Sequence, residues 1–109
     1  MKMVKAILKP ERFEFVKQAL EENGFVSLTV LWVRGRGEQK GIFLEYRGGQ
    51  MIVDMLPKIQ VEIVIKDNDV GIVIATIIDS ARTGKIGDGK IFVIPVEQSI
   101  RIRTGEMNV

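Results

Sequence analysis

Cysteine and histidine are both missing from this chain of 109 residues. Without cysteine there are no disulfides and no thiol chemistry, and without histidine the most common general base and metal ligand is lost. These two absences exclude most hydrolytic and transition-metal mechanisms in their usual form. Aromatic residues are also scarce at 6%, and the net charge of +2 is small for a nucleic-acid-binding protein, where a strong basic stripe is expected.

Long hydrophobic runs are absent as well, because the apolar stretches fall well short of the roughly 20 residues that cross a bilayer. The opening residues MKMVKAIL are typical of a strand and carry no signal-peptide cleavage site. We therefore expect a cytoplasmic protein. The remaining composition, 46% hydrophobic and 28% charged, is that of a soluble globular chain. We expect a single domain over residues 1–109.

Hydrophobic periodicity predicts the order βαββαβ, an α+β fold of the ferredoxin-like type. The strands are predicted at residues 3–8, 28–34, 59–65 and 91–96, and the helices at about 10–22 and 71–81. The second helix competes with a strand, because its many isoleucines have high β-propensity. Its length and the acidic residues Asp67 and Asp69, which we expect to cap it, favour the helix.

The segment from Glu38 to Asp54 sustains neither a helical nor a strand period. Its polar, glycine-containing pieces GEQKG and EYRGGQ predict a long loop. Loops beyond about 12–15 residues inside a compact domain are usually functional or disordered.

The stretch ARTGKIGDGKIFV, at residues 81–93, carries three glycines and three basic residues, and such a loop could hold a polyphosphate. The spacing from Gly84 to Lys90 fits a Walker A motif, but Ile91 stands where that motif needs a hydroxyl. The loop also follows a helix and enters a strand, which is the reverse of a P-loop. From the loop alone, a simple glycine-rich turn remains equally good.

Two arginines near the end of the chain favour the anion site. Arg101 and Arg103 alternate with Ile100 and Ile102, which predicts a short extended tail with both guanidinium groups on one face. Two such groups without partners need an anion or carboxylates.

Taken together, the loop and the element order make the chain resemble the PII-type nitrogen-regulatory signalling proteins. The similarity runs from Met1 to about Glu106 and includes KAILKPERFEFVKQAL, TVLWVRGRGEQKG, LEYRGG, VDMLPKIQVEIVI and ARTGKIGDGKIFVIPVEQSIRIRTGE. In that family's terms the T-loop is at about 37–55, the B-loop at about 82–90 and the C-loop at about 101–109.

The resemblance implies a homotrimer that binds ATP or ADP in clefts between subunits, with Mg²⁺ accompanying ATP and 2-oxoglutarate bound beside it. The nucleotide-binding positions it implies are Ile7, Thr29, Gly35, Gly37, Glu38, Gln39, Glu62, Val64, Arg82, Gly87, Asp88, Gly89, Lys90, Arg101 and Arg103. The 2-oxoglutarate positions are Gln39, Lys40, Gly41, Lys58 and Gly87. Gln39 would also reach Mg²⁺, which suits a site that borrows phosphate oxygens.

Sequence alone favours other roles for several of these residues. Ile7 and Val64 are expected to pack in the core, and Gln39 and Lys58 to be ordinary polar surface residues.

The chain departs from the family pattern within the T-loop. Met51 stands where many bacterial members carry a modifiable tyrosine, and Gly49 where some carry a phosphorylated serine. No modification is therefore expected, and regulation should be by ligands alone. Glu38 stands where many members carry an arginine, beside the expected phosphates. Its carboxylate would repel them unless Mg²⁺ or Lys40 offsets the charge.

The resemblance further implies a sensor rather than an enzyme, with at most slow ATPase activity. Its partner would be an ammonium transporter of the Amt class, engaged through Tyr46 and Arg47, so that membrane association occurs only through the transporter. The alternative partner is a nitrogen-assimilation enzyme such as glutamine synthetase or nitrogenase. A distant alternative is an RRM-like RNA-binding module, since GKIFVIPV is faintly similar to its aromatic strand signature, but only Phe92 supplies an aromatic there.

Overall fold

The computed structural model describes residues 1–37, 42–46, 48–53 and 55–108. The strands are β1 (Lys2–Leu8), β2 (Thr29–Gly35), β3 (Ile42–Tyr46), β4 (Gly49–Val53), β5 (Leu56–Ile65) and β6 (Lys90–Pro95). The helices are α1 (Phe13–Glu22) and α2 (Val70–Ala81), each preceded by a 3₁₀ turn, η1 (Pro10–Arg12) and η2 (Asp67–Asp69).

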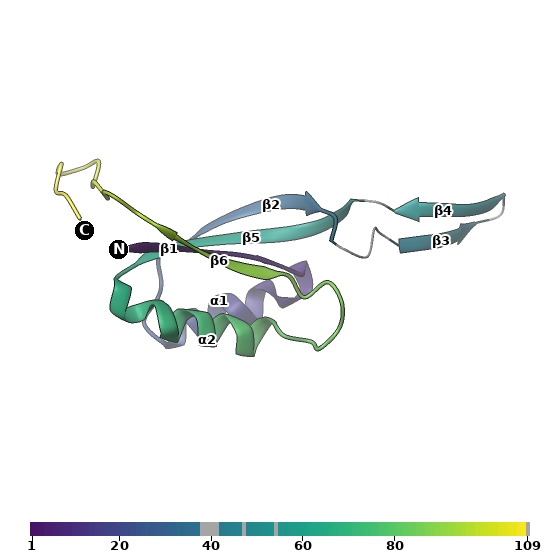
Figure 1. Ribbon diagram of the computed structural model, residues 1–109, viewed down its shortest axis with the longest axis horizontal. Helices are drawn as coiled ribbons and strands as arrows, with labels where there is room; N and C mark the ends of the chain where they lie inside the picture. Colours follow the sequence, from purple (N-terminus) through teal and green to yellow (C-terminus); the bar gives the residue numbers. More distant parts are fainter. Residues whose placement is uncertain (38–41, 47, 54, 109) are drawn as a thin grey trace.

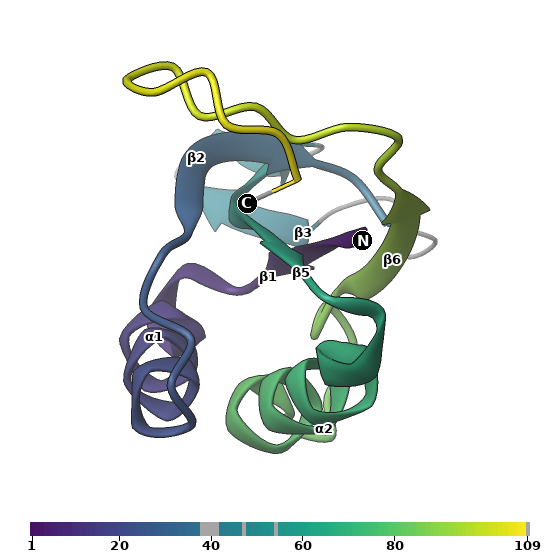
Figure 2. The same ribbon diagram turned by 90° about the vertical axis from the view of Figure 1, so that its left-hand side faces the viewer.

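Four antiparallel strands form the main sheet in the order β2-β5-β1-β6. Both helices cover the same face of this sheet, and the opposite face carries no helix (Figure 2). The βαββαβ ferredoxin-like order is thereby confirmed, and the segment 71–81 is a helix as predicted. We call the end where β1 finishes and β6 begins the loop end, and the other the tail end (Figure 1).

The core lies between the helices and the covered face of the sheet. On β5, alternate residues such as Ile59, Val61 and Ile63 are buried while the residues between them are not. This strict alternation is what a sheet covered on one face requires. Leu20 of α1 and Val73 of α2 are fully buried against the same face, so the two helices and four strands share one apolar core.

The prediction of a loop without secondary structure between the second and third strands was wrong. Strands β3 and β4 pair with each other in a separate antiparallel sheet, from Ile42 opposite Val53 to Tyr46 opposite Gly49. Short apolar runs, Ile42 to Leu44 and Met51 to Val53, on both sides of a glycine pair are a hairpin signal. The hairpin projects from the loop end (Figure 1), and the molecule is 60 Å long but only 26 × 20 Å across.

Two predicted local features also differ. Asp67 and Asp69 form the 3₁₀ turn η2 and make no side-chain capping hydrogen bond to α2. The tail is not extended through Arg103, because Gly105, with φ +73°, reverses the chain and lets Ile100 bridge to Met107. Arg101 and Arg103 therefore lie in a turn rather than on one face of a strand.

Candidate functional site

The B-loop joins the end of α2 to the start of β6, as predicted. Its path depends on glycines in the left-handed region, with φ of +82° at Gly84, +94° at Gly87 and +103° at Gly89. Gly89 is the most constrained, because a Cβ there would lie 1.7 Å from the carbonyl oxygen of Ile7. No residue other than glycine fits this approach to β1.

The Asp88 carboxylate is turned back onto the start of its own loop. Oδ2 accepts hydrogen bonds from the N–H groups of Thr83 and Gly84, each at 2.9 Å. Oδ1 accepts one from the Thr83 hydroxyl at 2.5 Å and lies 3.4 Å from Nζ of Lys9. Hydrogen bonds hold the pKa of Asp88 well below its usual range, first from the Thr83 hydroxyl and then from the N–H groups of Thr83 and Gly84 and from Lys9. Desolvation of the carboxylate raises the pKa, but by less than the hydrogen bonds lower it.

Lys58 of β5 reaches the same loop, because its Nζ donates a hydrogen bond of 2.7 Å to the carbonyl oxygen of Gly87. Lys9 also lies beside Gly87, with its Cε 3.5 Å from the position that a Cβ on Gly87 would take. The structure thus brings together Lys58 and Gly87, both predicted for 2-oxoglutarate. Two ammonium groups in this place suit a dicarboxylate or a phosphate.

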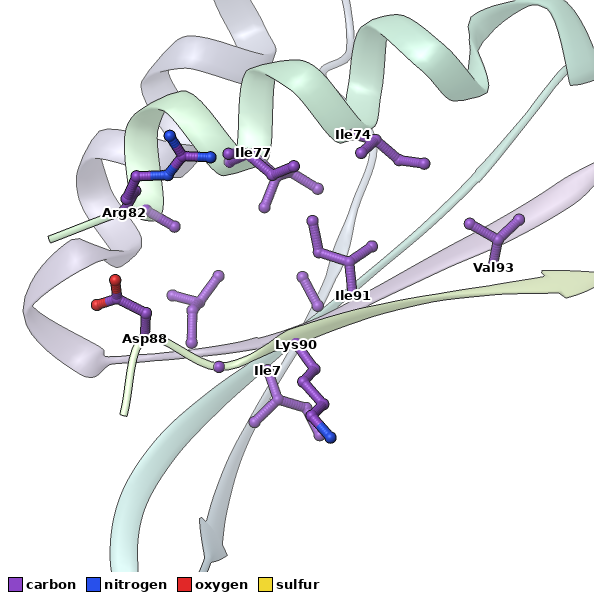
Figure 3. A pocket seen from close by; sticks show the side chains of 13 residues that line it. Ile7, Ile74, Ile77, Arg82, Asp88, Lys90, Ile91 and Val93 are labelled. Atoms are coloured by element: carbon purple, nitrogen blue, oxygen red, sulfur yellow. The ribbon is translucent and has the colours of Figure 1, made fainter. Parts of the chain in front are cut away.

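A cavity of about 460 Å³ lies between α2 and the strands β1 and β6. Apolar side chains such as Ile74, Ile77 and Ile91 line it (Figure 3). Lys90 and Ile7 point away from α2, to the uncovered face of the sheet, whereas Asp88 lies on the α2 side together with Arg82 (Figure 3). Five of the predicted nucleotide residues are among those that line this cavity, namely Ile7, Arg82, Asp88, Gly89 and Lys90.

A smaller cavity of about 320 Å³ lies toward the tail end. Three of the predicted nucleotide-binding residues line it, namely Thr29, Glu62 and Val64. Val64 is 43% exposed and Ile7 is not among the core residues, so the core-packing alternative was wrong for both. Side chains of Met3 and Leu28 also line this cavity and had not been predicted.

The predicted residues fall into two sets at opposite ends of the sheet. Ile7 pairs with Gln60, whereas Val64 pairs with Met3, four residues further along β5. At about 3.3 Å per residue this places Ile7 about 13 Å from Val64. Within one chain, Ile7 and Val64 therefore lie at separate places along the sheet.

The arginines belong to the tail end. Lys90 is opposite Ile7, and β6 then runs five residues to Pro95, about 17 Å, before the tail begins. The prediction took Arg101 to have no partner, but its Nη1 lies 3.5 Å from Oε1 of Glu106. Both side chains are about half exposed, so the pair is weak and can exchange for another anion.

Several predicted residues lie outside the part of the chain that the structure describes, namely Glu38, Gln39, Lys40, Gly41 and Arg47. Gly35 is the last residue of β2, at the loop end, and Gly37 follows the strand. The Mg²⁺ expectation rests on Gln39 and stays a prediction. The described residues hold no acidic cluster of metal-binding type, and no described helix is long and apolar enough to span a bilayer.

Sequence reasoning missed Thr83 and Lys9, whose side chains meet Asp88. Lys9 is 79 residues from Asp88, and no pattern in the chain links them. The signal for Thr83 was available, because a hydroxyl five residues before an aspartate in a glycine-rich turn can close the turn.

Comparison with known proteins gives a consistent result. Residues 1–106 match the family model described as nitrogen regulatory protein P-II. A nitrogen regulatory protein P-II of Nostoc punctiforme is 56% identical over 108 residues, covering 99% of this chain and 96% of its own. That of Microchaete diplosiphon is 55% identical over the same shares, and the P-II 2 protein of Methanothermobacter thermautotrophicus is 54% identical over 97% of this chain and 92% of its own.

Proposed function

This chain belongs to the P-II family of nitrogen regulatory proteins, and we propose that it senses nitrogen and energy status by binding ATP or ADP and 2-oxoglutarate in clefts between copies of itself. Members of the family are regulatory signalling proteins, and the match sets the RNA-binding alternative aside. The proposal adds the ligands, the assembly and a cytoplasmic location.

The division of the predicted nucleotide residues between the two ends of the sheet is the observation that carries this proposal. Ile7, Lys90 and the B-loop are at the loop end, and Val64 and the tail arginines are at the tail end. A homotrimer supplies the missing half of each site from a neighbouring copy. The uncovered sheet face supports this assembly, because it exposes apolar side chains including Phe92 and Val64.

The loop end has the chemistry expected for phosphates. The N–H groups of Gly87 and Asp88 make no hydrogen bond to another described residue, and the Lys90 side chain is exposed beside them. Backbone N–H groups next to a lysine are a common phosphate cradle. Charge-assisted contacts of this kind contribute about 1.5–3 kcal/mol each, enough together for micromolar affinity.

Titration calorimetry with ATP and ADP, with and without Mg²⁺, tests the nucleotide proposal. Lys90→Ala should weaken ATP binding about tenfold or more, because it removes a charged contact. Lys85→Ala is the matched control, since it removes an equal charge from the same loop, and we expect less than a threefold change. Failure of the unchanged protein to bind either nucleotide below millimolar concentration would refute the proposal.

The 2-oxoglutarate proposal is tested by a second titration in the presence of Mg²⁺ and ATP. Binding of the acid would replace the hydrogen bond from Lys58 to the Gly87 carbonyl with an ion pair. Lys58→Met should therefore abolish 2-oxoglutarate binding while changing ATP affinity less than Lys90→Ala does. Equal 2-oxoglutarate affinity in the Lys58→Met protein would remove Lys58 from the site.

We propose an ammonium transporter of the Amt class as the partner, bound through the T-loop. The hairpin β3–β4 supports this choice because it projects beyond the body of the molecule (Figure 1). Arg47→Ala should abolish co-purification with the transporter and leave ATP binding intact, and Arg47→Lys should keep part of the interaction. Transporter binding that persists in Arg47→Ala would refute this role for the arginine.

A further inference from the structure

Thr83 and Lys9 hold the one carboxylate of the B-loop in place. The Thr83 hydroxyl donates to Asp88 at 2.5 Å and accepts hydrogen bonds of 3.2 Å from Nζ of Lys9 and from the N–H of Lys85. Together with the N–H groups of Thr83 and Gly84, these contacts surround the Asp88 carboxylate with donors. We call this set of contacts the Asp88 clasp.

The Asp88 carboxylate and the Lys90 ammonium lie on opposite sides of the sheet (Figure 3). Asp88 and Lys90 would share a face in a regular strand, but Gly89 between them has φ +103°. As a result the Asp88 carboxylate lies on the α2 side of the sheet and the Lys90 side chain on the uncovered side (Figure 3). The side that carries Lys90 and Ile7 is the side on which the nucleotide is proposed to bind.

A carboxylate that left the clasp could turn toward the phosphates. Like charges about 6 Å apart repel strongly enough, even when partly screened by solvent, to weaken binding by roughly threefold to tenfold. The Thr83 hydroxyl is the shortest contact of the clasp, so its loss should free the carboxylate more than the loss of a longer one.

We propose that Thr83 is a positioning residue of the phosphate site, a role that rests on the proposed function. By holding Asp88 on the α2 side, with the help of Lys9, it leaves the N–H groups of the loop and the Lys90 ammonium, and no carboxylate, to face a polyphosphate. Thr83 itself does not touch the ligand. Its effect on affinity is therefore transmitted through the charge of Asp88.

A double-mutant cycle separates this electrostatic role from simple loop stability. Thr83→Val keeps the side-chain shape without the hydroxyl and should weaken ATP binding about threefold to tenfold. In the Asp88→Asn background, Thr83→Val should change the ATP affinity less than twofold, because no carboxylate remains to be held. Thr83→Ser should restore the affinity lost in Thr83→Val, and Thr83→Ala serves as a second variant without the hydroxyl.

Two outcomes would overturn the proposal. Equal ATP affinity in Thr83→Val and the unchanged protein would remove the positioning role and leave the proposed function standing. An equal loss in both backgrounds would show that Thr83 acts on loop shape and not through Asp88. Absence of ATP binding by the unchanged protein is a different result, which overturns the proposed function and the role built on it.

Hydrogen exchange of the free protein measures the clasp without any nucleotide. The N–H groups of residues 83 and 84 donate hydrogen bonds to the Asp88 carboxylate. These bonds should break more often when the carboxylate is released, so both N–H groups should exchange faster in Thr83→Val than in Thr83→Ser. Identical exchange in the two variants would also overturn the proposal.

Discussion

The B-loop and the C-terminal tail (96–108) both carry predicted phosphate-binding residues, but the chain holds them in different ways. The B-loop is fixed by the Asp88 clasp and by the hydrogen bond from Lys58 to Gly87. In the tail, backbone hydrogen bonds from Arg101 to Glu106, from Gly105 to Arg101 and from Asn108 to Ser99 join residues of the tail to one another. Its apolar residues lie open, with Ile102 fully exposed.

This difference is consistent with the proposal that one chain supplies only half of the site. The B-loop is already ordered by hydrogen bonds within one chain, so little conformational entropy should be lost there when a ligand binds. A tail with exposed isoleucines has the character of a segment that packs against another molecule. The following predictions test whether the loop is complete within one chain and the tail is not.

Gly89→Ala should produce the largest effect. Its Cβ would lie 1.7 Å from the carbonyl oxygen of Ile7 at a φ of +103°, so β1 and β6 must separate at the loop end. We expect the free energy of unfolding to fall by roughly 3 kcal/mol or more and ATP binding to be lost. Denaturant unfolding and calorimetry measure the two effects.

Gly84→Ala is the matched control for that change. Gly84 also has a left-handed φ, of +82°, but a Cβ there meets nothing within 4 Å. Only backbone strain remains, about 1–2 kcal/mol. If the two alanine variants lose equal stability, the close approach of Gly89 to β1 does not define the loop.

Arg103→Ala should have the next largest effect, on ligand binding alone. Arg103 is exposed in the tail, so we expect an unchanged melting temperature but ATP affinity about tenfold lower. Lys66→Ala removes an equal charge elsewhere on the surface and should change affinity less than twofold. An unaltered ATP affinity in Arg103→Ala would mean that the tail takes no part in the site.

Glu106→Gln should have a smaller effect in the opposite direction. It breaks the exposed pair of Arg101 and Glu106 at 3.5 Å, which is worth at most about 1 kcal/mol. With Arg101 released, ATP should bind up to about threefold more tightly. Weaker binding of ATP would indicate that the turn held by Glu106 is itself the binding conformation.

Acidification should have the smallest effect near neutral pH. The clasp holds the pKa of Asp88 below its usual range, and an unfolded aspartate titrates near 3.9. The stabilisation by the clasp is therefore fully present above about pH 4 and is lost only as the pH falls through the lower folded pKa. Exchange of the Gly84 N–H, corrected for the intrinsic rate, should show constant protection from pH 7 to 5, and a loss of protection in that window would contradict the account.

Sequence reasoning succeeded where one period governs a segment. The alternation from Ile59 to Ile65 predicted a strand, and the structure confirms it, with alternate residues buried as a half-covered sheet requires. It failed for the tail, where the same alternation of Ile100 to Arg103 is overridden by the turn at Gly105.

The site could be predicted only in part for a related reason. The glycines and Lys90 stand together in the chain and are recognisable as a loop. The contacts of Asp88 with Lys9 and of Gly87 with Lys58 join the B-loop to the residue after β1 and to β5. The contacting residues are 29 or more positions apart in the chain, and no pattern within one segment shows which of them meet.

Mixing two inactive variants tests most directly whether the site is shared between chains. Lys90→Ala lacks the loop half and Arg103→Ala lacks the tail half, so each alone should bind ATP weakly. When the two are unfolded together and refolded as a mixture, some neighbouring chains combine an intact Lys90 with an intact Arg103. The account predicts that the mixture regains a fraction of sites with the original ATP affinity, and affinity no better than that of the separate variants would contradict it.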